Sequence, residues 1–313
     1  MFAQRDLAIQ LNLNGSTFDG VNNVLTLRGL RAWATIQATT GGASPFFSQA
    51  QIRIEGMLGQ DMAQLSTLGL SAGFYTPNLI TVNAVSTQSD GTTQSALCFA
   101  GQIFEGFVDY NSQPNVGVVL KASATFASQI AGIASSSYQG SVSVATMLQA
   151  ICAAATPPLK LVNNGVTAVL SNHAVGGSAM NQIADICLAS LTNWSIVNGT
   201  LYVWPQGSQR DDQVITLTPE TGMKGYPMYS AQGIDVEMEY NQDVELGRQM
   251  TVESSIPPPG PNAPTSLGGV QPIGATGTYW IAGVTHELSS NVIGGPWFTK
   301  ANLTIVNTQL RQS

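Results

Sequence analysis

The sequence has very little charge. Of its 313 residues, 11 are Lys or Arg and 18 are Asp or Glu, which is 9% of the chain, against roughly 25% in an average soluble protein. The hydrophobic fraction is an ordinary 43%, whereas a disordered chain combines low hydrophobicity with high net charge. Because interface cores are depleted in charged residues, the composition fits a surface that partners largely cover.

Basic clusters, histidines and paired cysteines are equally scarce. The net charge is −7 and no window gathers Lys and Arg, which argues against specific nucleic-acid binding through phosphate contacts. The two histidines leave little room for histidine chemistry. Cys98, Cys152 and Cys187 form an odd set without CxxC spacing, so we expect buried free thiols in a reducing cytoplasm and no zinc site. No phosphate-binding glycine motif is present, and we expect no cofactor.

Long apolar runs are missing too. None approaches the roughly 18 residues of a membrane helix, and the first residues lack the apolar core and cleavage site of a signal peptide. We therefore expect a soluble protein that is made in the cytoplasm and does not insert into membranes.

The chain changes character twice along its length. Period-2 alternation in residues 1–130, as at 34–38 and 51–55, indicates strands. Helical spacing at 141–151 and 178–191, then a hairpin with an Asn-Gly turn over 194–204, indicates a small α+β insert. Strands return after 207, interrupted by a Pro/Gly-rich stretch, 255–277, which we expect to be a mobile surface loop. We expect three domains, 1–130, 131–206 and 207–313, in a mainly β fold.

The two β regions match each other weakly. Gln51-Ile52-Arg53-Ile54-Glu55 aligns with Gly233-Ile234-Asp235-Val236-Glu237, and Glu105 aligns with Glu287 at the same offset of 182 residues. Lys121-Ala122 aligns with Lys300-Ala301 at an offset of 179. The repeat predicts two duplicated β-barrel domains on either side of the insert. A closed trimer would then carry six similar units and present a quasi-sixfold ring.

Several short segments resemble the baseplate hub proteins of contractile-tailed bacteriophages, which are related to type VI secretion spike proteins. The segments are Ser48–Met57, Trp204–Gly207, Thr221–Pro227, His286–Leu288 and Gly294–Thr299. The resemblance implies a structural protein of the virion tail with two tube-like barrels per chain. It implies a homotrimer that joins the sixfold tail tube protein to the trimeric central spike protein, contacts other baseplate proteins, and forms part of the channel through which DNA leaves. Residues 1–30 have no role assigned by these segments.

The candidate interface or lumen-facing residues come from this reading. They are Ile52, Ile54, Glu55, Asp235, Glu237, Glu239 and Trp297. We expect Trp297 to pack in a core or against a neighbouring subunit. An acidic, Lys/Arg-poor lumen would repel phosphate and let DNA slide.

Two other functions remain open from the residues. Asp235, Glu237 and Glu239 could supply the paired carboxylates of a tail-associated cell-wall hydrolase, although period-2 spacing along one strand is typical of a solvated or lumen-facing sheet face. A receptor-binding module would be expected to show tandem repeats or an export signal. His286-Glu287 lacks the second histidine of a zincin because position 290 is Ser, and we expect His173 to be an ordinary surface residue. We expect no enzymatic activity.

Overall fold

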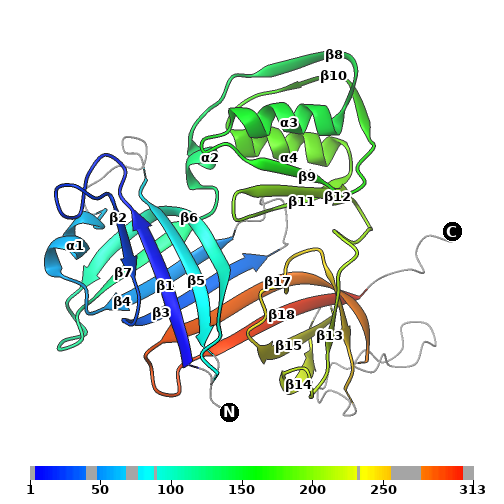
Figure 1. Cartoon of the computed structure of the whole chain (residues 1–313). Helices are drawn as coiled ribbons and strands as arrows, with labels where there is room; N and C mark the ends of the chain where they lie inside the picture. The colour runs from blue at the N-terminus through cyan, green and yellow to red at the C-terminus, as the bar shows by residue number, and fades with distance from the viewer. Residues whose placement is uncertain are drawn as a thin grey trace.

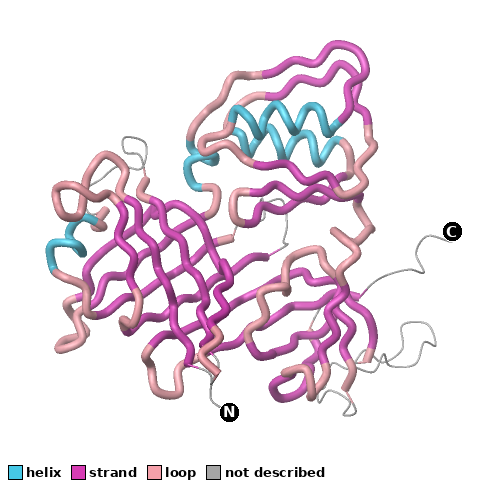
Figure 2. The backbone as a smooth tube through the Cα atoms, viewed as in Figure 1, coloured by secondary structure: helices cyan, strands magenta, loops and turns pink. Residues whose placement is uncertain are grey.

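A computed structural model describes residues 4–39, 48–67, 77–87, 90–230, 233–254 and 276–305. Nearly all of the expected loop 255–277 lies outside the described residues. The fold is mainly β, as predicted, with one large sheet and few helices (Figures 1 and 2).

The first β region forms one end of the large sheet. Its strands follow the order β3-β4-β7-β6-β5-β1-β2, and alternate residues of each strand are buried. The bounds are β1 Gln4–Asn12, β2 Val24–Leu27, β3 Arg31–Thr39, β4 Gln49–Glu55, β5 Leu79–Thr87, β6 Thr93–Asp109 and β7 Gly117–Ser123, with the short helices α1 Gly59–Gln64 and α2 Phe126–Ile130.

The second β region repeats this strand order. Its strands follow the order β14-β15-β18-β17, with β16 beside β17 and β13 beside β16. The strands β14, β15, β18, β17 and β16 therefore correspond to β3, β4, β7, β6 and β5. β13 lies where β1 would, but it pairs parallel with β16, whereas β1 pairs antiparallel with β5. The bounds are β13 Val214–Leu217, β14 Met223–Tyr229, β15 Gly233–Glu239, β16 Gln249–Val252, β17 Gly277–Ser290 and β18 Trp297–Ile305.

A β-bulge marks the same place in both repeats and corrects the sequence alignment. In β6 the register shifts between Ile103 and Glu105, and in β17 it shifts between Ile281 and Gly283. Superposing the bulges aligns Glu105 with Gly283, not with Glu287. An alternating pattern looks the same after a shift of two or four residues, which is why the sequence found the right strands but the wrong register.

The two repeats are joined through their backbones. Residues 32–39 of β3 pair antiparallel with residues 283–290 of β17, with Ile36 opposite His286. This joint makes one continuous sheet out of both β regions.

The α+β insert stands apart from the large sheet. Its helices α3 Val144–Ala154 and α4 Ala179–Ala189 lie between a two-stranded and a three-stranded sheet (Figure 1). The Oγ atoms of Ser143 and Ser178 accept hydrogen bonds from the backbone N–H of Thr146 and Asn181, which caps both helices. The strands are β8 Ser136–Ser143 with β10 Val169–Val175, and β9 Lys160–Asn163 with β11 Thr192–Val197 and β12 Thr200–Pro205.

Three apolar clusters form the core. One lies in the first β region, one in the insert and one in the second β region. The first cluster also contains Leu288 and Trp297, which belong to β17 and β18. The second repeat therefore completes the core of the first.

Replacing Trp297 by Ala should destabilise the whole chain. Trp297 is 7% exposed, and its ring lies edge-on to Tyr240 at 5.8 Å between centroids. Truncating a buried aromatic residue costs about 3–5 kcal/mol, which denaturant unfolding can measure. Ile293→Ala is the matched control because Ile293 is fully exposed; equal losses for both variants would contradict the assignment of Trp297 to the core.

Candidate functional site

The outer face of the continuous sheet carries a row of cross-strand partners that spans both repeats. Starting in β6, the row runs through Glu105, Lys121, Gln51, Thr35, Glu287, Phe298 and Glu239. Directly opposed residues lie on the same face of a sheet, so the ladder alone places this row. Each of the strands β6, β7, β4, β3, β17, β18 and β15 contributes one side chain to this row.

Most charges on this face are paired across strands. Lys121 Nζ lies 3.0 Å from Glu105 Oε1, and Lys300 Nζ lies 2.8 Å from Glu287 Oε1. In each repeat the lysine lies on the last strand of the sequence, β7 or β18, and the glutamate lies on the neighbouring strand, β6 or β17. Exposed pairs of this kind contribute little to stability, about 0–1 kcal/mol, but they fix where the charges lie.

Glu55 belongs to a tighter cluster at the far edge of this face. Arg53 Nε lies 3.1 Å from Glu55 Oε1, and Arg53 Nη1 lies 2.6 Å from Asp109 Oδ2. Hydrogen bonds from Ser112 and then Arg53 lower the pKa of Asp109, and the Asp109 carboxylate raises the pKa of Arg53. Arg31 approaches Glu55 Oε2 at 3.7 Å.

The three predicted carboxylates of β15 lie side by side on the same face. Asp235 Oδ1 accepts a hydrogen bond of 2.8 Å from Asn302 Nδ2. Glu237 is opposite Lys224 on one side and Lys300 on the other, and Glu239 is exposed. The period-2 burial of β15, with Ile234, Val236 and Met238 inside, is that of a strand with one solvated face.

The structure places the other candidates inside the chain. Ile52 and Ile54 are fully buried in the first core cluster, so their side chains face neither solvent nor a lumen. Trp297 is also in that cluster. The alternation that singled out residues 51–55 was right, but its apolar side faces inward and Glu55 is on the outward side.

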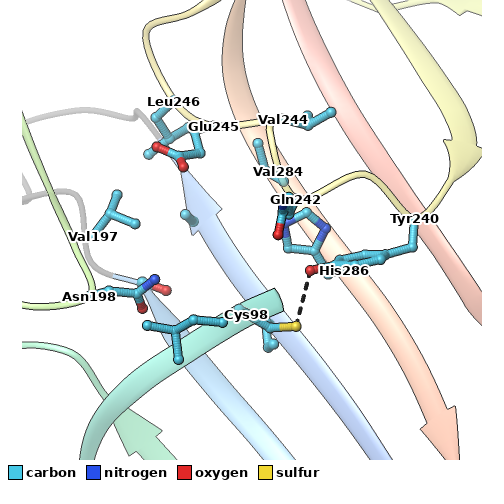
Figure 3. A pocket seen from close by; sticks show the side chains of 14 residues that line it. Cys98, Val197, Asn198, Tyr240, Gln242, Val244, Glu245, Leu246, Val284 and His286 are labelled. Atoms are coloured by element: carbon cyan, nitrogen blue, oxygen red, sulfur yellow. Dashed lines mark hydrogen bonds between the residues drawn. The ribbon is translucent and has the colours of Figure 1, made fainter. Parts of the chain in front are cut away.

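The three regions of the chain meet at a second place that the sequence did not indicate (Figure 3). The Asn-Gly turn of the insert reaches β6, where the backbone N–H of Ala100 donates to Asn198 Oδ1 at 3.0 Å. Cys98 Sγ lies 3.0 Å from Tyr240 Oη, and burial raises the pKa of Cys98 to about 11. The first contact holds the insert against the first repeat, and the second joins the first repeat to the second.

His286 lies on the buried side of β17 beside this junction. Its Nδ1 is 2.8 Å from Thr299 Oγ1, and its ring lies edge-on to Tyr240. Burial lowers the pKa of His286 to about 4. The neighbouring Glu287 points to the outer face, so the pair cannot act on one substrate atom.

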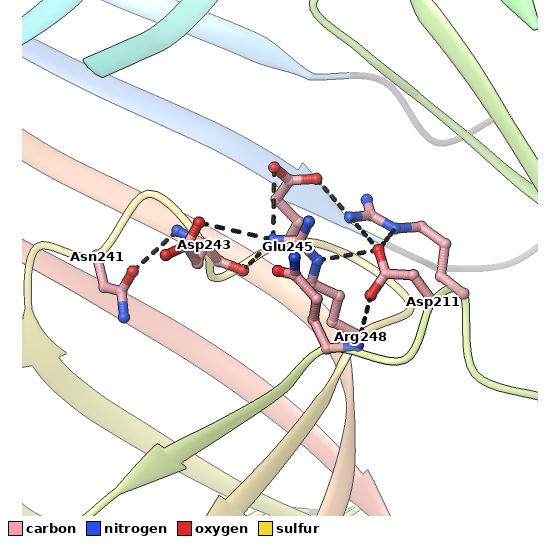
Figure 4. A network of polar contacts seen from close by, with 7 residues as sticks. Asp211, Asn241, Asp243, Glu245 and Arg248 are labelled. Carbon is pink, nitrogen blue, oxygen red and sulfur yellow. Dashed lines mark hydrogen bonds and ion pairs between the residues drawn. The ribbon is translucent and has the colours of Figure 1, made fainter. Parts of the chain in front are cut away.

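A buried arginine, Arg210, holds the insert to the second repeat. Figure 4 labels Asp211, Glu245 and Arg248 of the same network. Arg210 is 1% exposed; its Nη2 lies 3.0 Å from Asp211 Oδ2 and 2.7 Å from Glu245 Oε2. Its guanidinium also lies 4.6 Å from the centre of the Tyr202 ring. Arg248 Nε approaches Asp211 Oδ2 at 3.1 Å. The available signal in the sequence was the run of three charged residues at 210–212.

The remaining candidates for chemistry are dispersed. Cys98, Cys152 and Cys187 are free thiols, and burial raises the pKa of Cys152 to about 12. His173 lies in β10. Among the described residues, no three His, Cys, Asp or Glu side chains are close enough to hold a metal ion. No helix in the described part of the chain is long and apolar enough to cross a membrane.

Comparison with models of protein families shows which family the chain belongs to. The model of a family described as baseplate hub gp41 matches residues 56–261, more than half of the sequence. The chain belongs to the baseplate hub gp41 family. Membership gives this hub protein a structural role in the tail of a phage virion. A comparison with curated protein sequences finds no significant match.

Solved structures of other tail proteins share the fold of the hub protein. A tail protein from Neisseria meningitidis superposes with a TM-score of 0.58 at 9% identity, covering 96% of both chains. A 43 kDa prophage tail protein from Shewanella oneidensis superposes with a TM-score of 0.55 at 10% identity, covering 96% of this chain and 97% of the other. A chain of a Francisella PdpA-VgrG complex gives 0.52 at 8% identity, covering 97% of this chain and 58% of the other.

The buried histidine should make stability depend on pH. The pKa of His286 falls from 6.5 to about 4 on folding, so between these values the unfolded chain binds the additional proton. The contribution of His286 to the free energy of unfolding is therefore fully present above pH 6.5. It is lost as the pH is lowered towards 4, which reduces the free energy of unfolding by roughly 2–3 kcal/mol. Thermal unfolding over this range should show a flatter profile for His286→Gln, with His173→Gln as the control; identical profiles for wild type and His286→Gln would contradict it.

Removing the buried arginine should loosen the junction. Arg210→Ala leaves Asp211 and Glu245 without their buried partner, and breaking such a pair costs about 3–5 kcal/mol. Denaturant unfolding measures the loss. Arg28→Ala is the comparison because Arg28 is half exposed and makes one 3.4 Å contact with Asp6, so it should cost less than about 1 kcal/mol. A loss for Arg210→Ala as small as that would show that the network is not structural.

Proposed function

We propose that the chain is a trimeric baseplate hub that adapts the sixfold tail tube to the trimeric central spike. The observation that carries the proposal is the repeated strand order, β3-β4-β7-β6-β5 and β14-β15-β18-β17-β16. Two equivalent units in each of three chains give six positions around one axis. Such a ring meets a sixfold partner on one side and a threefold partner on the other. Its partners are the tail tube protein, the spike protein and other baseplate proteins.

The outer face of the continuous sheet is the proposed wall of the DNA channel. Acidic side chains outnumber basic ones on the face, and its lysines and arginines are held in contacts with carboxylates or with Phe298. A wall without free cations does not gain the counterion release that binds a protein to phosphates. DNA would therefore slide past Asp235, Glu237 and Glu239 without being held.

We infer further that the hub has no enzymatic activity. The carboxylates of β15 lie among lysines and an asparagine on an open sheet face, and not in a pocket that would exclude water from a reacting bond. Its role is load bearing and symmetry matching.

Light scattering of the purified chain tests the trimer. We expect a molar mass about three times 32.8 kDa, with ring-shaped particles and six similar lobes in negative-stain averages. A chain that stays monomeric at every concentration, alone and with its tube and spike proteins, would contradict the proposal.

Peptidoglycan clearing tests the absence of catalysis. Wild type and Glu237→Gln should both leave the turbidity of a peptidoglycan suspension unchanged, because Glu237 lies on a solvated strand face. Clearing by wild type that Glu237→Gln abolishes would establish a hydrolase in place of a purely structural protein.

A further inference from the structure

The joint between the repeats has a defined construction. One edge of β17 pairs with β18 over residues 279–288. The opposite edge is divided: residues 277–280 pair with β16, and after the bulge residues 283–290 pair with β3. The joint therefore uses the part of β17 that extends beyond its own repeat.

β6 is built in the same way but lacks the last partner. One edge pairs with β7 over residues 102–109, and the opposite edge pairs with β5 over residues 93–102. After the bulge, Gly106 exchanges hydrogen bonds of 2.9 Å with Thr67, its N–H donating to Oγ1 and its carbonyl accepting from the Thr67 N–H. Beyond Gly106, residues 107–109 pair with no strand on this edge within the described ranges.

β14 is the matching edge strand of the second repeat. It occupies the position that β3 has in the first repeat, yet among the described strands it pairs with β15 alone. Two of its large side chains, Tyr226 and Met228, are 57% and 60% exposed. An open edge with exposed apolar residues is a template for pairing with another chain.

We propose that β14 of one protomer pairs antiparallel with the 107–109 end of β6 in a second copy of this chain, which repeats the β3–β17 joint between subunits. The inference rests on the proposed trimer and names the interface that closes it. The contact is heterologous, because it joins two different edges, and it closes into a ring when the rotation is threefold. Three joints within chains and three between them then alternate around six equivalent units.

The repeat also gives the register of the proposed joint. Thr35 is opposite Glu287 in the joint within the chain. The pairing of β3 with β4 and of β14 with β15 shows that Met228 has the position in the second repeat that Thr35 has in the first. Counting from the two bulges shows that Asp109 has the position in β6 that Glu287 has in β17. Met228 of one protomer should therefore lie opposite Asp109 of the next. The same step along both strands places Ser230 opposite Phe107.

Cysteine cross-linking tests both the contact and its register. Opposed residues of antiparallel strands have Cα atoms about 4.5–5.5 Å apart, which is within the range of a disulfide. After mild oxidation of the full chain, Met228→Cys/Asp109→Cys should give covalent dimers and trimers on a non-reducing gel. The yield should be on the order of tenfold above that of the control, because a disulfide tolerates little extra separation.

The matched control keeps the cysteine on β14 and moves its partner. Gln94 lies in the part of β6 that already pairs with β5, so Met228→Cys/Gln94→Cys should give no more cross-linked product than Met228→Cys alone. The single variant Met228→Cys also measures any cross-linking through the three native thiols. Ser230→Cys/Phe107→Cys is the second test pair in case the loss of Asp109 from Arg53 perturbs folding. Circular dichroism should show that each variant is folded.

The outcomes separate this inference from the proposed function. A trimeric wild type in which neither test pair links above the control overturns the strand pairing and leaves the trimeric hub in place. A wild type that never associates overturns both. Covalent trimers from the test pairs alone support the pairing and its register.

Discussion

The antiparallel pairing of β3 with β17 is the constraint on which the rest of the structure depends. It joins residues 32–39 to residues 283–290, across almost the whole sequence. A slip of one residue would turn every side chain of a strand to the opposite face, so this ladder fixes which residues of the two repeats share a face. The row from Glu105 to Glu239 exists only because the ladder is in this register.

The scarcity of charge acquires a structural explanation. The charged residues are concentrated where strands meet or regions join, as in the pairs Lys121–Glu105 and Lys300–Glu287 and in the cluster around Arg210. Uncharged polar residues such as Gln51 and Thr35 separate the pairs along the outer face. The composition is therefore that of a protein whose few charges are positioned and whose remaining surface is left neutral.

The sequence predicted individual strands and helices better than it predicted strand register and contacts between distant segments. Alternation located β4 and β15, apolar spacing located α3 and α4, and Asn198-Gly199 located the β11–β12 turn. The strand β8 was missed because its Ser-rich segment alternates weakly and none of its residues is buried. The register of the repeat was wrong, since period-2 patterns match equally well after even shifts. The burial of Arg210 was missed because it depends on Glu245, which lies far along the chain from Arg210 and Asp211 and which only the fold brings close.

The shared core has a consequence for synthesis. The first apolar cluster needs Leu288 and Trp297, so the amino-terminal repeat lacks part of its interior until residue 297 has left the ribosome. Domains usually fold one after another as they emerge, but here only the insert, with a cluster drawn from residues 144–203, has all its buried residues early. β4 can cover one edge of β3 early, but the other edge stays unpaired for some 240 further residues, from Thr39 to Gly283. Such exposed edges are where newly made β proteins aggregate or recruit chaperones.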